Sequence, residues 1–422
     1  MADRKLATAS HYLFLGLMVA LPWSIAPMSI AAVLCAAATL LVWALAGVPL
    51  GTPPSTERWT RTPADLPALA WIAALVLASV FAVDPAASWP RVVKGLLLVL
   101  VPVAAYHARD EAFARRAVAI LLASACAAAL FALVKFGVQG PAFPNRVKGA
   151  VNHPLTYGGQ ALLFAALASA IAIRGRGLWR VGALASLACL LPALAGTYTR
   201  SAWIGYVVAL GVVIAFTRAR WLAVLGAALV PLTFLLQGTY RARALSIFDP
   251  SSPWNRERLH MWEAGARMWR DHPWTGVGLQ DLHALYDRYR SAAAMEPAGH
   301  LHSVYVHVAA TMGVFGLAAL AVLIAGLLTA SWRGFRESRS DFGTALALGV
   351  LAGLIGFFVA GFFEWNLGDE ELLDLLYTLV GIAFAARVWT LNLSARARAA
   401  GESSAPDLPA PPAEEAVASL HA

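Results

Sequence analysis

The long polar segment of this chain ends at Gly299-His300-Leu301-His302-Ser303-Val304-Tyr305, where an apolar run over 304–330 begins. That run can cross a bilayer, because a spanning helix takes about 20 mostly apolar residues. His302 therefore stands at the predicted boundary between membrane and water. A histidine there can meet both a lipid-carried group and a soluble one, and the alternative is that it only caps the following helix.

The composition predicts the fold class. Hydrophobic residues make up 59% of the 422 residues and charged residues only 13%, whereas a soluble domain of this size would need far more surface charge. We therefore expect an all-α polytopic membrane protein in contact with a phospholipid bilayer. The net charge of +8 does not indicate a nucleic-acid partner, because Lys and Arg lie mostly in short gaps between apolar runs instead of on one solvated face.

The length rule predicts about 12 transmembrane helices, with about 11 as the competing count because the first two runs can form one broken hairpin. We divide the chain into spans one to nine over 1–237, a large polar loop over 238–302, spans ten to twelve over 303–390, and a tail over 391–422. The tail lacks the apolar content to fold and is predicted to be disordered. The runs are 11–24, 26–47, 64–83, 89–107, 113–138, 156–173, 179–197, 201–217, 220–237, 303–331, 342–365 and 371–390.

The distribution of arginines predicts the orientation, since cytoplasmic loops carry an excess of Lys and Arg. With a cytoplasmic N-terminus every inside loop is basic, whereas the outward stretch 364–371 is acidic. Both termini then face the cytoplasm, and the loop 238–302 faces the periplasm from a bacterial inner membrane. The inside arginines are Arg58, Arg61, Arg109, Arg115, Arg116, Arg174, Arg176, Arg180, Arg218, Arg220, Arg333, Arg336 and Arg339.

Some cations lie on the outward side, against this bias, and a charge kept there needs a partner. A phosphate-bearing ligand is one such partner. The alternative is neutralisation by the carboxylates of Asp249, Glu257, Glu263 and the stretch 364–371. The outward cations include Arg91, Arg146, Lys148, Arg200, Arg241, Arg243, Arg256 and Arg258.

One amphipathic helix is predicted inside the polar loop. Ser252 is a suitable N-cap, Pro253 suits the first helical position, and His272-Pro273 ends the pattern. Its tryptophans suit the membrane–water boundary, and Trp262 shares a face with Arg258 four residues earlier.

Two glycine-containing stretches flank His302 in the sequence. Thr275-Gly276-Val277-Gly278 is predicted to be a tight turn, because it lacks the Lys-Ser/Thr of a phosphate loop. Gly313 lies deep in the next apolar run, where a small residue lets another helix approach closely.

No metal or cofactor is predicted. His300, His302 and His307 are spaced by two and five residues, which does not place them on one helix face as an i, i+4 pair would be. The outward side has no Asp-x-Asp pair to hold a divalent cation, and the three cysteines lie in apolar runs without a CxxC pair. Arginines can neutralise a leaving pyrophosphate instead, because their planar forks match phosphate oxygens.

Several motifs resemble those of the bacterial O-antigen ligase family, which shares its central region with O-antigen polymerases and protein O-oligosaccharyltransferases. The resemblance covers residues 140–330 with specific motifs and the rest by topology. Ser303 stands where family members often carry Asn. The motifs are Arg258-Leu259-His260-Met261-Trp262, Asp271-His272-Pro273-Trp274-Thr275-Gly276-Val277-Gly278, and His302 followed by Gly313.

This resemblance implies a membrane-embedded, GT-C-like glycosyltransferase that needs no metal ion. It implies transfer of a glycan from undecaprenyl pyrophosphate to a sugar hydroxyl of lipid A-core, in lipopolysaccharide biosynthesis and with inversion. The family's essential histidine falls on His302, and its essential outward arginines fall on Arg200 and Arg258. His302 would accept the hydroxyl proton while the arginines hold the diphosphate. Further substrate-binding residues would be Arg146, Lys148, Arg91, Trp262 and Arg241.

Other functions remain open. An O-antigen polymerase would use the same lipid-linked donor. A lipid-phosphate transporter or flippase would also place arginines in the membrane, although the sequence shows no inverted repeat. A protein O-oligosaccharyltransferase would tend to be longer, with a soluble C-terminal region.

Overall fold

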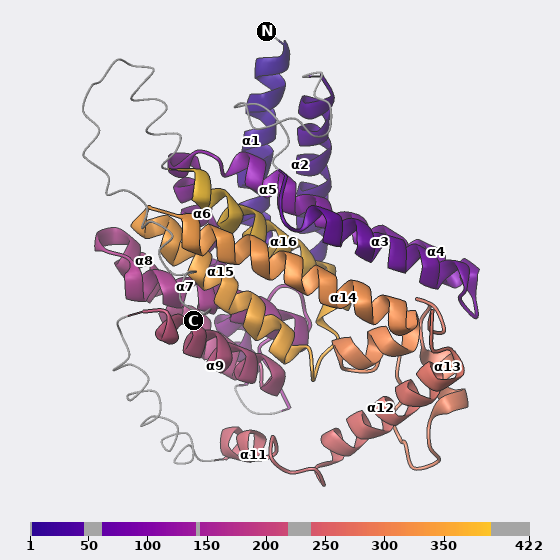
Figure 1. The fold of residues 1–422 in the computed structure, drawn as a ribbon. Coiled ribbons are helices and arrows are strands. Elements are labelled where there is room, and N and C mark those ends of the chain that lie inside the picture. The colour runs from indigo at the N-terminus through magenta and orange to yellow at the C-terminus, as the bar shows by residue number, and fades with distance from the viewer. Residues whose placement is uncertain (1, 46–60, 141–143, 218–237, 390–422) are drawn as a thin grey trace, which may run out of the picture.

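The computed structural model describes residues 2–45, 61–140, 144–217 and 238–389, and no β-strand occurs among them. Their helices form one elongated bundle with a smaller layer at one end (Figure 1). The elements are α1 Ala2–Ala20, α2 Ile25–Leu45, α3 Asp65–Val80, α4 Pro85–Val92, η1 Val93–Val99, α5 Leu100–His107, α6 Glu111–Gln139, α7 Pro154–Arg174, α8 Gly177–Gly196, α9 Arg200–Ala215, α11 Thr239–Leu245, α12 Pro253–Asp271, α13 His283–Tyr289, α14 Val304–Glu337, α15 Asp341–Ala360, η2 Asn366–Gly368, α16 Glu370–Ala385 and η3 Ala386–Val388.

Seven helices among the described residues are long and apolar enough to cross a membrane. They are α2, the continuous stretch Pro85–His107, α6, α7, α8, α14 and α15, and three shorter apolar helices accompany them. The chain is therefore a multi-pass membrane protein, and its described residues have the helical fold that its composition predicts. The span count of the sequence analysis stays a prediction, because its ninth run, 220–237, and the tail 391–422 lie outside the described residues.

The centre of the bundle is built from α7 and α15, whose side chains are almost all buried. The two helices pack against each other and against α9. Gly205 of α9 and Gly356 of α15 face each other so closely that a Cβ on either would collide with the backbone of the other. Small residues allow this close packing, which is the usual device where lipid provides no hydrophobic drive between helices.

The helix α14 is broken at Gly313, whose φ of 61° and ψ of −156° are not helical. The loop 273–278 fills the break and donates backbone N–H bonds to the carbonyls of Ala310 and Thr311. A Cβ at Gly276 or Gly313 would collide with the backbone that faces it. The predicted close approach at Gly313 therefore exists, but a turn-containing loop makes it instead of another helix. The break leaves a short first segment of α14 that begins just after His302.

The polar loop forms the layer at the end of the bundle, where α11, α12 and α13 lie (Figure 1). The predicted helix is α12, which begins at Pro253 and ends at Asp271. Ser252 precedes it as expected, but its side chain makes no capping hydrogen bond. Met261, Met268, Leu285 and Tyr286 form a small hydrophobic core between α12 and α13.

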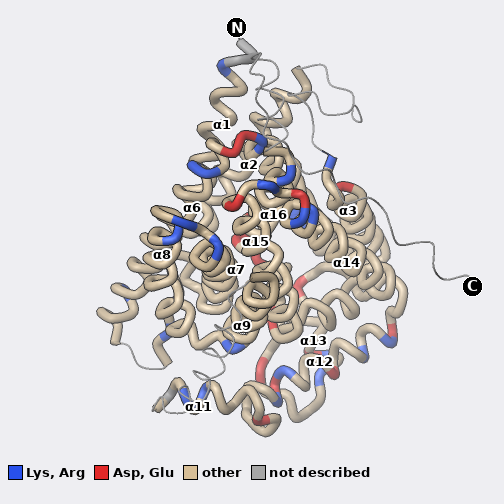
Figure 2. The backbone as a smooth tube through the Cα atoms, turned by 60° about the vertical axis from the view of Figure 1, so that its left-hand side comes forward, with Lys and Arg blue, Asp and Glu red and all other residues tan. Residues whose placement is uncertain are grey.

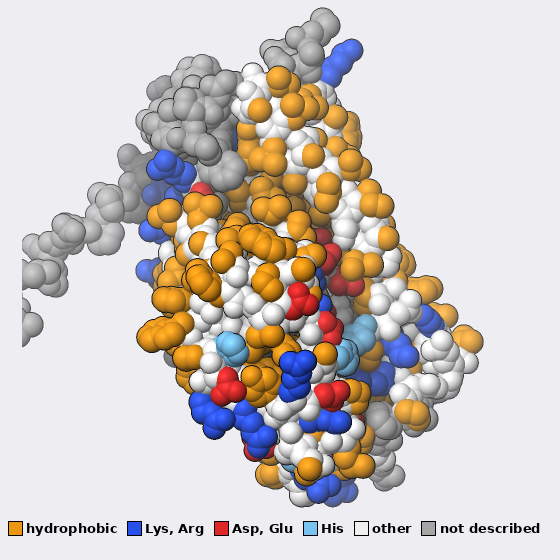
Figure 3. Space-filling view, turned by 90° about the vertical axis from the view of Figure 1, so that its right-hand side faces the viewer, with side chains coloured by type: hydrophobic (Ala, Val, Ile, Leu, Met, Phe, Trp, Pro, Cys, Tyr) orange, Lys and Arg blue, Asp and Glu red, His pale blue; other side chains and the backbone are white. Residues whose placement is uncertain are grey.

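Charged residues gather in two zones, with long uncharged stretches of helix between them (Figure 2). One zone follows α11, α12 and α13, and the other lies toward the end of the bundle where α1 begins. Figure 3 looks onto the side that carries α4 and α13, and its lower half gathers basic, acidic and histidine side chains. Such a distribution suits an apolar belt between two polar surfaces.

Candidate active site

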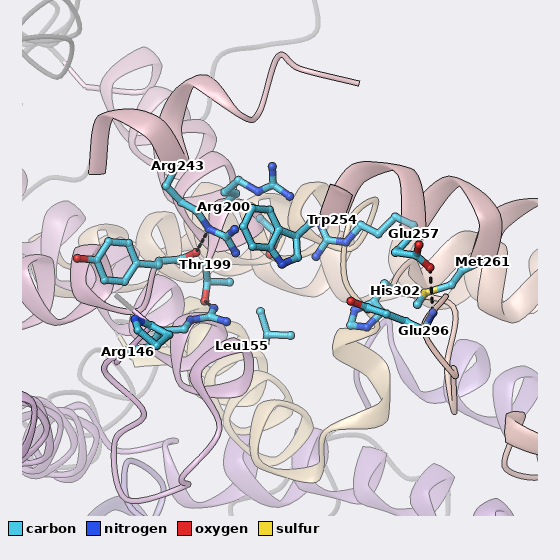
Figure 4. Close-up of a pocket in the computed structure, with 14 residues that line it drawn as sticks. Arg146, Leu155, Thr199, Arg200, Arg243, Trp254, Glu257, Met261, Glu296 and His302 are labelled. Atoms are coloured by element: carbon cyan, nitrogen blue, oxygen red, sulfur yellow. Dashed lines mark hydrogen bonds between the residues drawn. The ribbon is translucent and has the colours of Figure 1, made fainter. Parts of the chain in front are cut away.

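A pocket of about 370 Å³ lies between the bundle and the layer of α11 and α12. Figure 4 shows Arg146, Arg200 and Arg243 on one side of this arginine pocket, with His302 on the other. Arg258 completes the cationic set. The remaining lining residues are Pro144, Leu155, Tyr198, Thr199, Ser201, Trp254, Glu257, Met261 and Glu296.

The residues directly before and after His302 in the chain hold its backbone in place. Leu301 is fully buried beneath α12, and its carbonyl accepts a hydrogen bond from Trp262 Nε1 at 3.1 Å. Ser303 caps α14, because its Oγ accepts from the backbone N–H of Val306. Between these anchors His302 has a φ of 43°, in the left-handed region that non-glycine residues rarely adopt. Such strain persists only where the surroundings enforce it, and it is common at functional sites.

Glu364 holds the imidazole of His302. Its Oε1 lies 2.8 Å from His302 Nδ1, and its Oε2 lies 3.5 Å from an Nη of Arg258. Burial by itself would raise the pKa of Glu364, but the charge of His302, their hydrogen bond and the charge of Arg258 outweigh it and lower the pKa to about 2. An ionised carboxylate can only accept, so Nδ1 must carry the proton. In a neutral imidazole Nε2 is then the nitrogen that can accept one.

Arg200 is the first residue of α9 and is 7% exposed. Its guanidinium donates to the backbone carbonyl and Oγ of Ser246 at 2.9 and 3.0 Å, and to Asn255 Oδ1 at 2.7 Å. All of these acceptors are neutral. They orient the guanidinium without cancelling its charge.

Arg146 is held in the same way. Its Nε donates to the Thr197 carbonyl at 2.7 Å and an Nη donates to Thr199 Oγ1 at 3.0 Å. Burial and the neighbouring charge of Arg243 lower the pKa of Arg146 to about 10, which still leaves it protonated at neutral pH. Neither Arg146 nor Arg200 forms an ion pair with a carboxylate of the described residues. Of the pocket arginines, Arg258 has a carboxylate partner among the described residues, and outside the pocket Arg91 faces Asp281.

Arg243 belongs to the pocket although the sequence analysis selected Arg241. Arg243 packs over the ring of Trp254, with its guanidinium carbon 4.6 Å from the ring centre. Arg241 is exposed and does not line the pocket. Both residues are on α11, and positions two apart point in different directions on a helix. Helical phase could thus have shown that only one of them faces the pocket, but not which one.

Three other predicted substrate-binding residues lie outside the pocket. Lys148 is exposed to solvent, and Trp262 supports the backbone before His302. Arg91 lines a different cavity and lies 3.9 Å from Asp281. The structure therefore brings Arg146, Arg200, Arg258 and His302 together and leaves these three apart.

A short polar chain outside the pocket lining connects the start of α7 with the start of α16. His153 Nδ1 lies 2.9 Å from Thr156 Oγ1, which donates to Asp369 Oδ2 at 2.8 Å. Burial is the main reason that the pKa of Asp369 is raised to about 7, and the charge of Glu364 adds to it. The pKa values of Asp369 and Glu364 are thus shifted in opposite directions.

His300, His302 and Glu364 form a compact cluster, which we call the polar trio. One possible ligand atom from each lies within 4.8 Å of the others. The trio differs from the histidine set considered in the sequence, because His307 instead packs against Trp365 with ring centres 3.9 Å apart. Burial and the charge of His302 lower the pKa of His300 to about 4, so His300 is neutral at pH 7. The absence of a required metal stays a prediction, and chelation can test it.

Residues 184–321 match a family model described as O-antigen ligase. The matched region carries Arg200, Arg243, Arg258 and His302, whereas Arg146 and Glu364 lie outside it. No curated protein matches the chain.

Proposed function

We propose, on the premise that residues 184–321 belong to the O-antigen ligase family, that this protein is an O-antigen ligase. It would transfer a glycan from undecaprenyl pyrophosphate to a sugar hydroxyl of lipid A-core. One observation carries the proposal. A pocket with two arginines that no described carboxylate neutralises faces a histidine whose Nδ1 is bonded to an ionised glutamate.

The arginine pocket would hold the diphosphate of the donor. Its guanidinium groups crowd positive charge into a partly buried space, and an anion there relieves the repulsion. Arg146 and Arg200 are held by neutral acceptors, so their charge is available to the phosphate oxygens. The same charge would stabilise the pyrophosphate as it leaves.

His302 would act as the general base. Its Nε2 takes the proton of the acceptor hydroxyl as that oxygen attacks the anomeric carbon of the donor. The bond from this carbon to the phosphate oxygen breaks, and its electron pair leaves with undecaprenyl pyrophosphate. Glu364 stabilises the imidazolium that forms, through its bond to Nδ1. Direct displacement inverts the anomeric configuration.

The membrane location follows the same proposal. The apolar helices are long enough to cross a bilayer, and the arginine pocket lies at the polar layer of α11 and α12. We place this layer in the periplasm, with the protein in the bacterial inner membrane and a GT-C-like architecture. A lipid-linked donor could then keep its isoprenoid chain in the bilayer while its diphosphate reaches the pocket.

An O-antigen polymerase would use the same donor pocket and the same base. The two reactions differ only in the acceptor, which is lipid A-core in the ligase and a second lipid-linked glycan in the polymerase. The described lining residues are assigned to the donor and the base, which both reactions share, so the experiment compares the acceptors.

The test uses the full chain in nanodiscs with undecaprenyl-pyrophosphate glycan. One sample contains lipid A-core and the other a second portion of donor. Glycan on lipid A-core supports the ligase, and a lengthened donor glycan would instead establish the polymerase. His302→Ala is the matched inactive control, and transfer by that variant at the wild-type rate would refute the proposed base.

A further inference from the structure

A second cavity, of about 100 Å³, is left without a role by the reaction proposed above. Arg91 and Lys94 line it together with the aromatic residues Trp71, Trp365 and Tyr377. It shares no lining residue with the arginine pocket. A cavity that holds one water needs only about 10–15 Å³. The second cavity can therefore hold a group of several heavy atoms, but not a glycan.

The pair of His302 and Glu364 stands between the two cavities. His302 lines the arginine pocket and bonds Glu364. Trp365, the residue after Glu364, lines the second cavity and packs on His307, which lines it as well. A molecule seated in the second cavity would therefore lie beside Trp365, next in the chain to the glutamate that bonds the base.

The cations of the second cavity are paired unequally. Lys94 Nζ donates to the Gly368 carbonyl at 2.7 Å and lies 3.4 Å from Glu370 Oε1, so its bonds serve the loop before α16. Arg91 lies 3.9 Å from Asp281, which is beyond hydrogen-bond distance, and both side chains are about half exposed. The guanidinium N–H groups of Arg91 can therefore donate hydrogen bonds to a ligand, and the charge of Lys94 adds positive potential beside them.

We propose that this cavity binds a phosphate group on the sugar headgroup of the acceptor, with Arg91 as its main contact. The proposal rests on the proposed function, and it assigns the two cavities to the two substrates. A phosphate group has the size that this cavity admits, and the cations that line it would bond its charge. The larger arginine pocket already accounts for the donor diphosphate.

The test measures binding of lipid A-core to the full chain in nanodiscs, because binding does not require turnover. Wild type, Arg91→Gln, Arg91→Lys and the control Arg270→Gln are compared. Arg270 is an equally charged residue on α12 that is mostly exposed and lies 3.6 Å from one carboxylate. Each variant is measured with four ligands: lipid A-core, enzymatically dephosphorylated lipid A-core, the undecaprenyl-pyrophosphate donor, and phosphatidylglycerol.

We expect Arg91→Gln to raise the Kd for lipid A-core about tenfold, since one charge-assisted bond is lost. Binding of the dephosphorylated acceptor and of the donor should not change, and Arg91→Lys should recover much of the loss. Equal weakening for both acceptors, or none, would overturn the proposal. So would weaker binding of phosphatidylglycerol alone, because the cavity would then be a phospholipid site. Transfer by the same wild-type sample decides the proposed function separately.

Discussion

Replacing Glu364 by Gln would test how the base is held. The substitution keeps the size of the side chain and removes a negative charge that is 2.8 Å from His302 Nδ1 and 3.5 Å from Arg258. A hydrogen bond to a charged group contributes about 1.5–3 kcal/mol, and its loss from the imidazolium-forming step predicts a decrease in kcat of about 10- to 150-fold. The loss would be larger if the amide NH₂ turned toward Nδ1, because that arrangement fixes the wrong tautomer.

The assay separates the chemical step from donor binding. Turnover at saturating donor and the Kd of the donor are measured for wild type, Glu364→Gln and His302→Ala. Glu364→Gln should lower kcat and leave donor affinity equal or stronger, because Arg258 loses its only ion pair within the described residues. His302→Ala should lower kcat about a hundredfold or more with donor affinity nearly unchanged. The double variant should be little worse than His302→Ala, since both changes affect one unit.

Glu371→Gln is the matched control, because it removes an acidic charge near the start of α16 without touching His302. Thermal stability of every variant is measured to detect misfolding. The reasoning would be refuted if Glu364→Gln kept kcat within about twofold of wild type while weakening donor binding. Glu364 would then only position Arg258, and the base would have to be sought elsewhere, beginning with Asp369.

Four further predictions follow from the same geometry. Arg200→Lys should weaken donor binding by about 1.5–3 kcal/mol, because an ammonium cannot make the two-pronged contact; near-wild-type affinity would show that Arg200 acts as a simple charge. EDTA should leave transfer intact, and activity that is lost and then restored by a divalent cation would make the polar trio a metal site. In a cysteine-free background, Ser251→Cys should react with an impermeant thiol reagent in intact spheroplasts and Arg339→Cys should not. The opposite labelling would show that the predicted topology is inverted. Ser251 is chosen because its neighbour Ser252 is buried. The raised pKa of Asp369 means that its neutral form is favoured on folding, so its contribution to stability is complete below the unfolded pKa of about 3.9 and is lost as pH rises through about 7. The thermal stability of Asp369→Asn relative to wild type should therefore increase over that pH range, by up to about 1.4 kcal/mol per pH unit, and a constant difference would contradict the shift.

The sequence was sufficient for the helical membrane class, although not for the number of spans, because the signal of an apolar helix is local. An apolar run of sufficient length must satisfy its backbone internally, and this requirement is independent of what packs beside it. For the same reason the start of α12 could be located from Ser252 and Pro253, although the side chain of Ser252 makes no capping hydrogen bond. The position of His302 at the end of the polar loop was likewise visible as a change of composition along the chain.

The tertiary structure alone decided which side chains meet. Glu364 lies 62 residues after His302, and nothing near either residue in the sequence links them. An acid near the end of the apolar run 342–365 was the one available signal, and it could equally have been a partner for the outward arginines. Arg91 and Arg200 looked alike as outward cations, yet the packing of α4 and α9 places them in different cavities. Composition and periodicity specify where a helix begins and which face is apolar, whereas the distance between two side chains on different helices depends on how the whole bundle packs.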